Sequence, residues 1–429
     1  MRVLNVIGVG PGNPELVTRQ AVKAIQDSQA VLGAKRALTT AMAVLENKPE
    51  NRLLFEANGN NEILTFIEEH PEIERFSAVF TGDTSVYSGA VSLRKAIRDM
   101  QKDATGETGF SLVNYPGVSS IQYFLSKSGI SMADVKLVSL HGRSLDMVPI
   151  IRENRYVCVL LESEDNAACI AEKLQQFGLS RVVITVGERL SFEDESFTTG
   201  SPKEIRKQRF DRQAIALFRN DEYRIPTRAY GISDERFQQN GSISMTRRDV
   251  RALSLCRLAL HENSVVYDIG AGTGSVSIEA ALACPEGMVI SVESDEDAAV
   301  MIEQNRFDFQ IDNIRVVRGN APECFNGMTI CDHAAEEKVL PRPDCVFIGG
   351  SKGKLAEIVG WAIEANPKVV IVINTVTLEG ISEILALEKK MTDYQFEMVE
   401  IQATGLERRG SYHMHQAENP VTITRISRR

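Results

Sequence analysis

Short apolar runs alternate with segments of helical periodicity along most of the chain, a pattern typical of parallel sheets covered by helices. In the first half, the runs that we expect to be strands are Val3–Val9, Ser77–Phe80, Ser111–Asn114, Val135–Ser139, Val157–Leu161, Val182–Val186 and Ile215–Phe218. In the second half they are Val265–Ile269, Met288–Glu293, Ile314–Arg318, Asp344–Ile348 and Lys368–Asn374. The pattern predicts an α/β protein.

A polar stretch without periodicity, Arg219 to Pro226, divides the chain into two parts. At about 150 residues per domain, the 429 residues suffice for roughly three domain-sized units. We therefore expect domains at residues 1–222 and 223–429. The turn sequence Tyr115-Pro116-Gly117-Val118-Ser119-Ser120 lies near the middle of the first part, and it predicts two lobes there, about 1–115 and 116–222.

Composition narrows the class of protein. Charged residues make up 25% and hydrophobic residues 43% of the chain, as in folded globular proteins, and the net charge of -10 disfavours binding to nucleic-acid phosphates. No apolar run reaches the roughly 18 residues of a membrane-spanning helix, and the first run breaks at Gly8, before a signal-peptide core would be complete. The 7 cysteines are odd in number, and several lie in apolar runs, which indicates reduced core residues. We expect a cytoplasmic protein that binds neither membrane nor nucleic acid.

The clearest chemical signal is the segment Val265–Glu279, where an apolar strand leads through Gly270, Gly272 and Gly274 into a helix. Glycines at such a turn let the main chain approach a ligand, and the helix N-terminus presents N–H groups to it. The next predicted strand ends at Glu293, about 20 residues after the last glycine, where a carboxylate can accept both hydroxyl hydrogens of a ribose. The Gly-x-Gly-x-Gly spacing favours an adenosyl cofactor over a dinucleotide; a turn that needs glycine only for close packing is the alternative.

Histidines and cysteines give no comparable signal for a metal. His413 and His415 alternate along one predicted strand face, but no third ligand is evident, and we interpret them as exposed polar residues. Cys324, Cys331 and His333 lack the paired spacing of a zinc site. We therefore expect no metal.

The second half resembles the C-terminal half of the decarboxylating precorrin-6Y C5,15-methyltransferases. The segments that carry the resemblance are Met245–Arg251, Asp268–Glu279, Gly319–Glu323, Phe347–Ser351 and Val372–Glu379. They occur in the order expected of that family, while the segment from Met328 to Leu340 is longer than expected. The resemblance implies a Rossmann-like class I methyltransferase domain that uses S-adenosylmethionine.

The first half is similar to the tetrapyrrole methylase superfamily. The matching segments are Gly8–Thr18, Thr81–Tyr87, Pro116–Ser120 and Leu140–Arg143, with one departure at Thr84, where the superfamily usually has proline. Together the two resemblances cover nearly the whole chain. They imply a two-lobed tetrapyrrole methylase fold followed by the Rossmann-like domain, in the order of the fused bifunctional enzyme.

The resemblance also implies a reaction and a set of cofactor residues. Both halves would use S-adenosylmethionine on one corrin precursor: the first would methylate carbon 5, and the second would methylate carbon 15 and remove carbon dioxide from the ring C acetate. The residues implied around the cofactor are Pro11, Gly82, Asp83, Thr84 and Ser119 in the first half and Gly270, Gly272, Gly274, Glu293, Asn320 and Ala321 in the second. We also expect at least a dimer, since homo-oligomers are common among tetrapyrrole methylases.

A tetrapyrrole substrate of this kind carries many carboxylates, so an acidic enzyme needs cations beside it. The candidates are Arg143, Arg247, Arg251 and Lys352, for each of which a solvated surface position is the alternative. Asn374, Thr375 and Thr377 follow the carboxyl end of a predicted strand, where ligands of open α/β sheets bind, and we expect them to act in the decarboxylation. Capping of the strand end is their alternative role.

Other classes of protein remain open at this point. A nicotinamide-dependent oxidoreductase has the same strand, glycine loop and ribose-binding acid. A nucleic-acid methyltransferase is disfavoured by the negative charge and by the segment Phe347-Ile348-Gly349-Gly350, which stands where amino-methylating enzymes of that kind carry an Asn/Asp-Pro-Pro-aromatic motif. A non-catalytic scaffold that binds tetrapyrroles is the third alternative.

Overall fold

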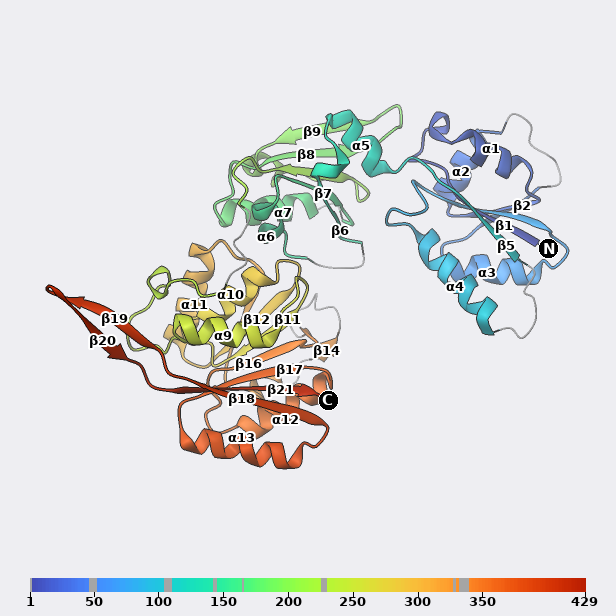
Figure 1. The fold of residues 1–429 in the computed structure, drawn as a ribbon. Coiled ribbons are helices and arrows are strands. Elements are labelled where there is room, and N and C mark those ends of the chain that lie inside the picture. Colours follow the sequence, from blue (N-terminus) through green and yellow to red (C-terminus); the bar gives the residue numbers. More distant parts are fainter. Residues whose placement is uncertain are drawn as a thin grey trace. The chain divides into compact units, whose positions relative to one another are not determined.

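The computed structural model consists of two compact units (Figure 1). It describes residues 2–45, 52–103, 110–141, 145–163, 166–224, 230–326, 329–331 and 339–429. The first unit comprises Met1–His141, Tyr156–Ala168 and Val183–Arg219, and the second comprises Gly142–Arg155, Cys169–Val182 and Asn220–Arg429. Two short segments that lie between strands of the first unit in the sequence therefore pack with the C-terminal part of the chain.

The first unit begins with a five-stranded parallel sheet in the order β3-β2-β4-β1-β5. Its strands are β1 (Arg2–Gly8), β2 (Ala30–Gly33), β3 (Leu53–Glu56), β4 (Arg75–Phe80) and β5 (Phe110–Tyr115), and its helices are α1 (Arg19–Gln26), α2 (Lys35–Ala43), α3 (Asn60–Glu69) and α4 (Gly89–Asp103). Leu4 and Val6 pack into one core cluster while Ile7 and Val9 pack into another, so both faces of β1 are covered. This explains why residues on both faces of β1, such as Leu4, Val6 and Ile7, are apolar. β2 and β3, which have only 4 residues each, are not among the strands that the apolar runs predict.

The second sheet of this unit differs from the expected parallel arrangement. Its order is β6-β7-β10-β8-β9, and of its neighbouring pairs β6 and β7 are parallel while β7–β10, β10–β8 and β8–β9 are antiparallel. The connection from β8 to β9 is too short for the crossover that parallel strands require. The strands are β6 (Lys136–Ser139), β7 (Tyr156–Leu160), β8 (Val183–Glu188), β9 (Ser196–Gly200) and β10 (Ile215–Arg219), and the helices of this sequence region are α5 (Ser120–Ser128), α6 (Met147–Glu153), α7 (Asn166–Gln176) and α8 (Pro202–Ile205).

The second unit is built on a seven-stranded sheet in the order β13-β12-β11-β16-β17-β21-β18. Its strands are β11 (Val265–Ile269), β12 (Met288–Glu293), β13 (Ile314–Arg318), β16 (Cys345–Ile348), β17 (Val370–Thr375), β18 (Tyr394–Ile401) and β21 (Val421–Arg428). The first five are parallel to their neighbours, whereas β21 lies antiparallel between β17 and β18. The five parallel strands lie within two residues of their predicted bounds, whereas β18 and β21 were not predicted.

Helices cover both faces of this sheet. They are α9 (Arg248–Leu258), α10 (Ser275–Ala283), α11 (Glu296–Asp308), α12 (Leu355–Ala365) and α13 (Leu378–Lys390). Residues of α9 and α10 belong to one core cluster, and residues of α12 and α13 belong to the cluster on the opposite face (Figure 1). The chain runs outward from β11 through β12 to β13, then returns to β16 on the other side of β11, so the strand order reverses between β11 and β16. Ligands of open α/β sheets bind at the carboxyl ends of the strands at such a point.

A two-stranded hairpin extends from the C-terminal sheet, and Figure 1 shows it projecting away from the body of the second unit. It consists of β19 (Thr404–Arg409) and β20 (Tyr412–Ala417), whose residues are all exposed. Tyr412 is 75% exposed and Leu406 63% exposed, so the hairpin presents large apolar side chains to solvent. A second small sheet pairs β14 (Thr329–Cys331) with β15 (Val339–Pro341). Among the described residues, no helix combines the length and the apolar character needed to cross a membrane.

Candidate functional sites

In the N-terminal half, three glycines meet at the carboxyl ends of neighbouring strands. Gly8 ends β1, Gly82 follows β4, and Gly117 follows β5. A Cβ atom on Gly117 would lie 2.3 Å from the carbonyl oxygen of Gly82 and 2.6 Å from that of Gly8. Gly10 and Gly82 also exchange main-chain hydrogen bonds of 3.1 and 2.7 Å. Because no side chain fits where Gly8, Gly82 and Gly117 meet, the loops present main-chain atoms at this edge of the sheet.

Asp83 ties two of these loops together. Its Oδ2 accepts a hydrogen bond of 3.0 Å from the N–H of Gly117, and its Oδ1 accepts the N–H and the hydroxyl of Ser85. Burial raises the pKa of Asp83, but the hydrogen bonds from Ser85 and Gly117 outweigh burial, and the pKa lies below its usual value. Asp83 is thus a carboxylate whose two oxygens hold the β4 loop to the β5 loop.

The other predicted cofactor residues of this half lie on the same loops. Pro11 and Thr84 are buried, and their carbonyl oxygens accept hydrogen bonds from Arg36 at 2.8 Å and from Arg94 at 3.0 Å. Ser119 caps α5 by accepting the N–H of Ile121 at 3.2 Å. A Cβ on Gly82 would meet nothing nearer than Ser119 at 3.9 Å, so there is room beside Gly82. The structure therefore brings Pro11, Gly82, Asp83, Thr84 and Ser119 to one edge.

In the C-terminal half, the glycine loop joins β11 to α10 at the point where the strand order reverses. Gly270, Gly272 and Gly274 all have φ between 56° and 76°, the left-handed region that favours glycine. A Cβ on Gly270 would lie 2.8 Å from the carbonyl oxygen of Gly350, which follows β16. The loop and the end of β16 are therefore in close main-chain contact.

Glu293, at the end of β12, points its carboxylate at this loop. Its Oε2 accepts the N–H of Gly272 at 2.9 Å, while Oε1 accepts the N–H groups of Ser294 and Asp295 at 2.7 and 2.9 Å. The Lys352 ammonium lies on the neighbouring loop and donates to Ser294 Oγ at 2.5 Å. The glycine loop, Glu293 and Lys352 thus lie close together at the carboxyl ends of β11, β12 and β16.

Asp268, one residue before the end of β11, is fully buried behind the loop. Its Oδ2 accepts the hydroxyl of Ser277 at 2.5 Å, and its Oδ1 has no hydrogen-bond partner among the described residues. Burial raises the pKa of Asp268 to about 7; the hydrogen bonds from Ser277 lower it and the charge of Glu293 raises it further. The same region holds Thr273, whose buried Oγ1 also lacks a partner in the described part of the chain.

Two further predicted cofactor residues follow β13. Asn320 is exposed and Ala321 is buried, and the N–H of Gly319 immediately before them donates to the carbonyl oxygen of Glu293 at 2.9 Å. They therefore lie next to the strand end that carries the acid. This places all six cofactor residues predicted in this half along the ends of β11, β12 and β13.

The structure places Arg251, which the sequence predicts as a cation beside the substrate, in the protein interior. Its side chain is 0% exposed and pairs with Glu279 on α10, with 2.5 Å between Nε and Oε1. Its other nitrogens donate to Asp234 Oδ1 at 3.1 Å and to the carbonyl oxygens of Thr246 and Ile232. Arg251 is thus a buried structural cation, and the carboxylates of a substrate cannot reach it in this structure.

The other predicted substrate cations have different positions. Arg247 is exposed, and its guanidinium lies 3.7 Å from Asp234 and 3.8 Å from Glu418. Lys352 is exposed beside the glycine loop. Arg143 lies outside the described residues.

Asn374 and Thr375 are the last two residues of β17 and Thr377 follows it, and all three have partners inside the protein. The amide of Asn374 exchanges hydrogen bonds of 2.9 and 3.0 Å with Ser254 Oγ on α9. Thr377 caps α13 by accepting the N–H of Gly380 at 3.1 Å, and Thr375 Oγ1 accepts the N–H of Thr377 at 3.4 Å. These contacts account for their positions, while their expected action in the decarboxylation stays a prediction.

Histidine and cysteine side chains give no cluster of three possible metal ligands among the described residues. His413 and His415 lie on the exposed β20, and Cys324 is a free cysteine. The side chains of Cys331 and His333 lie outside the described residues.

The segment before the glycine loop is held by residues that were not predicted from the sequence. They are Asp234, Ser244, Glu279 and Asn305. Glu279 gave a usable signal, because it is a single acid in the apolar helix sequence Val276-Ser277-Ile278-Glu279-Ala280-Ala281. Such an acid is buried only with a partner, which pointed to a cation elsewhere in the chain.

Comparison with known proteins first defines the class. Residues 3–206 match the family model of tetrapyrrole (corrin/porphyrin) methylases, and residues 235–428 match that of the precorrin methyltransferase domain. The chain is a methyltransferase of two parts, with a tetrapyrrole methylase fold followed by a Rossmann-like domain, which confirms the predicted fold class.

Individual relatives narrow the class to a family. A precorrin-6Y C(5,15)-methyltransferase (decarboxylating) from Sinorhizobium sp is 30% identical over 369 residues, which cover 84% of this chain and 81% of the relative. A probable cobalt-precorrin-6B C(15)-methyltransferase (decarboxylating) from Pyrobaculum calidifontis is 38% identical over 196 residues, covering 45% of this chain and 93% of the relative. A crystal structure of precorrin-6Y C5,15-methyltransferase from Geobacter metallireducens shares 31% identity, covers 47% of this chain and 98% of that chain, and has a TM-score of 0.41. On the evidence of the first relative, this chain belongs to the precorrin-6Y C5,15-methyltransferase (decarboxylating) family.

This membership confirms the family expected from the sequence motifs. It leaves the oxidoreductase and the nucleic-acid methyltransferase without support.

Proposed function

We propose that this chain is a bifunctional enzyme of cobalamin biosynthesis. The N-terminal domain, residues 1–222, methylates precorrin-6Y or its cobalt analogue at C5. The C-terminal domain, residues 223–429, methylates C15 and removes the ring C acetate carboxylate as carbon dioxide, giving precorrin-8X. The observation that carries the proposal is that one chain holds, in the same order, both methyltransferase parts that match the Sinorhizobium relative over most of its length.

S-adenosyl-L-methionine is the methyl donor that we propose for both halves, and the residues of the C-terminal site fit it. Glu293 presents a carboxylate, a group that accepts ribose hydroxyls, and the Gly270–Gly274 loop presents main chain without side chains. Asn320 and Ala321 border the same edge. Together these groups would hold the adenosyl part of the donor.

The residues of the N-terminal site fit the donor through main chain. Asp83 joins the β4 loop to the β5 loop through its hydrogen bonds with Ser85 and Gly117, and it thereby shapes the edge that would receive the donor. Pro11, Gly82 and Ser119 supply main-chain groups, and the room beside Gly82 lets a ligand approach closely.

The donor supplies an electrophilic methyl group on a positively charged sulfur for in-line attack by a ring carbon. The task of the chain is alignment and exclusion of water, and it needs neither a metal nor a side-chain nucleophile. Lys352 and Arg247, and Arg143 outside the described residues, would hold substrate carboxylates. In the decarboxylation the bond from the acetate carbon to its carboxylate breaks, the electron pair enters the conjugated macrocycle, and a proton is taken up at the ring. Asn374, Thr375 and Thr377 would orient that acetate.

Two further expectations belong to this proposal. The chain would form a homo-oligomer, and the exposed Leu406, Tyr412 and Met414 on the projecting hairpin favour assembly through that arm. The protein would work in the cytoplasm, where its free cysteines stay reduced.

The test is incubation of the full chain with precorrin-6Y and isotopically labelled S-adenosylmethionine, followed by mass spectrometry. We expect the mass of two labelled methyl groups to be gained and that of carbon dioxide to be lost. If the chain binds the macrocycle but the macrocycle gains no mass, the chain is a non-catalytic scaffold that binds tetrapyrroles. This outcome would refute the proposal.

A further inference from the structure

The glycine loop of the C-terminal half is covered by a segment of its own chain. Residues Gly231–Thr246, called the strap here, precede α9, and the carbonyl oxygen of Ser244 accepts the N–H of Thr273 in the loop at 3.2 Å. A Cβ on Gly272 would lie only 2.2 Å from that same oxygen. The strap therefore touches the part of the main chain that the proposed function assigns to the cofactor.

A buried asparagine links the strap to the loop a second time. Asn305 on α11 accepts the N–H of Gln238 at 2.6 Å and donates to the carbonyl oxygens of Gln238 at 3.2 Å and Thr273 at 2.9 Å. Both main-chain groups of Thr273 are thereby fixed, one by the strap and one by the residue that also holds the strap. The conformation of the loop depends on where the strap lies.

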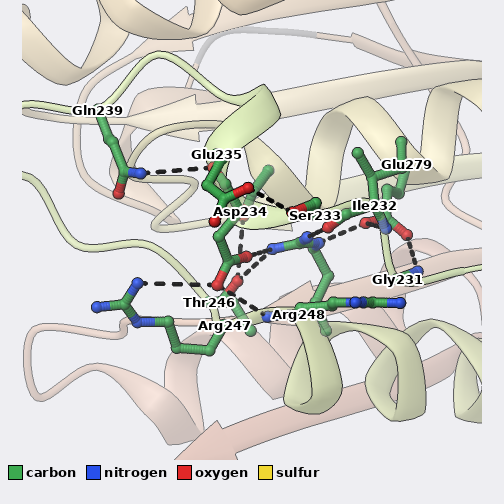
Figure 2. A network of polar contacts seen from close by, with 12 residues as sticks. Gly231, Ile232, Ser233, Asp234, Glu235, Gln239, Thr246, Arg247, Arg248 and Glu279 are labelled. Atoms are coloured by element: carbon green, nitrogen blue, oxygen red, sulfur yellow. Dashed lines mark hydrogen bonds and ion pairs between the residues drawn. The ribbon is translucent and has the colours of Figure 1, made fainter. Parts of the chain in front are cut away.

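Both ends of the strap are hydrogen-bonded to the Arg251–Glu279 pair. Figure 2 shows Gly231, Ile232 and Glu279 of this network. At the first end, Glu279 accepts the N–H groups of Gly231 and Ile232 at 2.7 and 2.9 Å, and Arg251 donates to the carbonyl oxygen of Ile232. At the other end, Arg251 donates to the carbonyl oxygen of Thr246 at 2.6 Å. Besides Glu279, every acceptor of Arg251 described here belongs to the strap.

The charges and the packing support this role. The side chains of Arg251 and Glu279 are 0% and 2% exposed, and burying such a pair is costly unless further hydrogen bonds satisfy its remaining donors and acceptors. The main chain of the strap supplies those hydrogen bonds, and Asp234 adds a third charge. Phe237 of the strap packs under the guanidinium at 4.7 Å. A pair that served only to join α9 to α10 would not need these partners.

We propose that Arg251 and Glu279 are positioning residues for the C15 reaction: they hold the strap against the glycine loop, so that Gly272 and Thr273 keep the conformation that receives the adenosyl cofactor. The inference rests on the proposed function. It assigns to this pair no contact with the substrate.

The test uses the full chain with the double substitution Arg251→Met and Glu279→Leu. Replacing both partners by apolar residues avoids leaving one buried charge alone, so the domain is expected to fold. The readouts are hydrogen exchange in peptides covering residues 231–246 and 270–276, and calorimetric titration with S-adenosylhomocysteine. The Gly272→Val variant is expected to bind the ligand at the N-terminal site alone, so it shows which part of the calorimetric signal belongs to that site. Glu235→Gln is the matched control, because Glu235 lies in the strap and contacts Ser233.

We expect exchange in both peptides to be about tenfold faster and binding at the C-terminal site about tenfold weaker, with the N-terminal site unchanged. Methylation at C15 would need correspondingly more S-adenosylmethionine and reach nearly its normal rate at saturation, a separation that general destabilisation would not produce. Normal exchange and normal affinity in the folded double variant would overturn the inference.

Two outcomes separate this inference from the proposed function. If the unsubstituted chain binds S-adenosylhomocysteine at neither site, the proposed function fails, and the exchange data still report whether the pair holds the strap. If the double variant does not fold, Asp234→Ala takes its place, because it removes a strap contact and leaves the buried pair intact. Faster exchange and weaker binding in that variant would support the inference, and wild-type values would refute it.

Discussion

The two halves of the molecule both place glycines at the carboxyl ends of parallel strands, but they build this edge differently. In the N-terminal half, Gly8, Gly82 and Gly117 come from three separate loops and contact one another. In the C-terminal half, the glycines follow one another in a single loop, where Gly272 contacts Ser244 of the strap and Gly270 contacts Gly350. Both halves thus present main chain at the strand ends. In the N-terminal half three loops pack against one another, and in the C-terminal half the strap covers a single loop.

This difference affects whether a substitution at the glycines changes mainly the stability or mainly the activity of the protein. Where glycines from three strands pack together, a side chain on any of them displaces several loops and so strains the whole sheet edge. Where a single loop is covered by a strap, a side chain displaces the cover and leaves the sheet beneath it in place. We therefore expect substitutions in the N-terminal half to cost stability and substitutions in the C-terminal half to cost mainly activity.

The largest effect is expected from Gly117→Val. Its Cβ would lie 2.3 Å from the carbonyl oxygen of Gly82 and 2.6 Å from that of Gly8, and main chain cannot move aside as a side chain can. We expect loss of methylation at C5 and destabilisation of the first unit by about 3 kcal/mol. Thermal unfolding followed by calorimetry measures the second effect. An unchanged transition would show that the three loops do not depend on one another.

Gly272→Val is the corresponding change in the other half. Its φ of 56° and the distance of 2.2 Å from a Cβ to the Ser244 oxygen both exclude a side chain. We expect methylation at C15 and decarboxylation to fall at least about 100-fold, while methylation at C5 continues on a suitable intermediate. Mass spectrometry of the macrocycle distinguishes the two methylations. Loss of both, with the fold intact, would contradict the division of labour between the halves.

Asp83→Ala tests the same N-terminal loops without adding volume, because it removes the carboxylate that links two of them by hydrogen bonds. The N–H of Gly117 loses its acceptor, so we expect destabilisation of about 1–2 kcal/mol and methylation at C5 about tenfold slower. The C15 reaction serves as the internal control. Unchanged methylation at C5 would count against the assignment of Asp83 to this site.

The last expected effect, on stability, is a pH dependence that belongs to the C-terminal half. Burial raises the pKa of Asp268 from 3.8 to about 7, so the folded protein keeps a proton that the unfolded chain releases between these values. The stabilisation is complete below about pH 4 and is lost as the pH rises to about 7.

Asp268→Asn removes this titration. At about 1.4 kcal/mol per pKa unit, the two units between pH 5 and the pKa of about 7 correspond to about 3 kcal/mol, which we expect the variant to gain relative to the unsubstituted chain between pH 5 and pH 8. Urea unfolding at the two pH values measures it, with the exposed Asp297→Asn as control. If the free energy of unfolding changes equally between the two pH values in Asp268→Asn and in the unsubstituted chain, Asp268 does not titrate in this range.

The parts of the molecule that sequence could predict are those set by local patterns. The apolar runs predicted β1, β4 and β5 and the five parallel strands of the second unit, and the glycine spacing with Glu293 predicted that the loop and the acid lie together at the strand ends. The position of Arg251 depends on Glu279, 28 residues further along the chain, and no local pattern records such a pairing. The place of β21 between β17 and β18 depends likewise on pairing between distant segments. Exposed and buried arginines look alike until their partners are known.

The hairpin of β19 and β20 has a consequence for how this enzyme can vary. Ile401 and Val421, at its base, are already paired in the β18–β21 ladder, and none of the hairpin residues belongs to the core clusters of the second unit. A short turn between these two residues would close the ladder just as well. The arm can therefore lengthen, shorten or change its surface in evolution or by engineering without any change in the β18–β21 ladder or in the core clusters of the second unit.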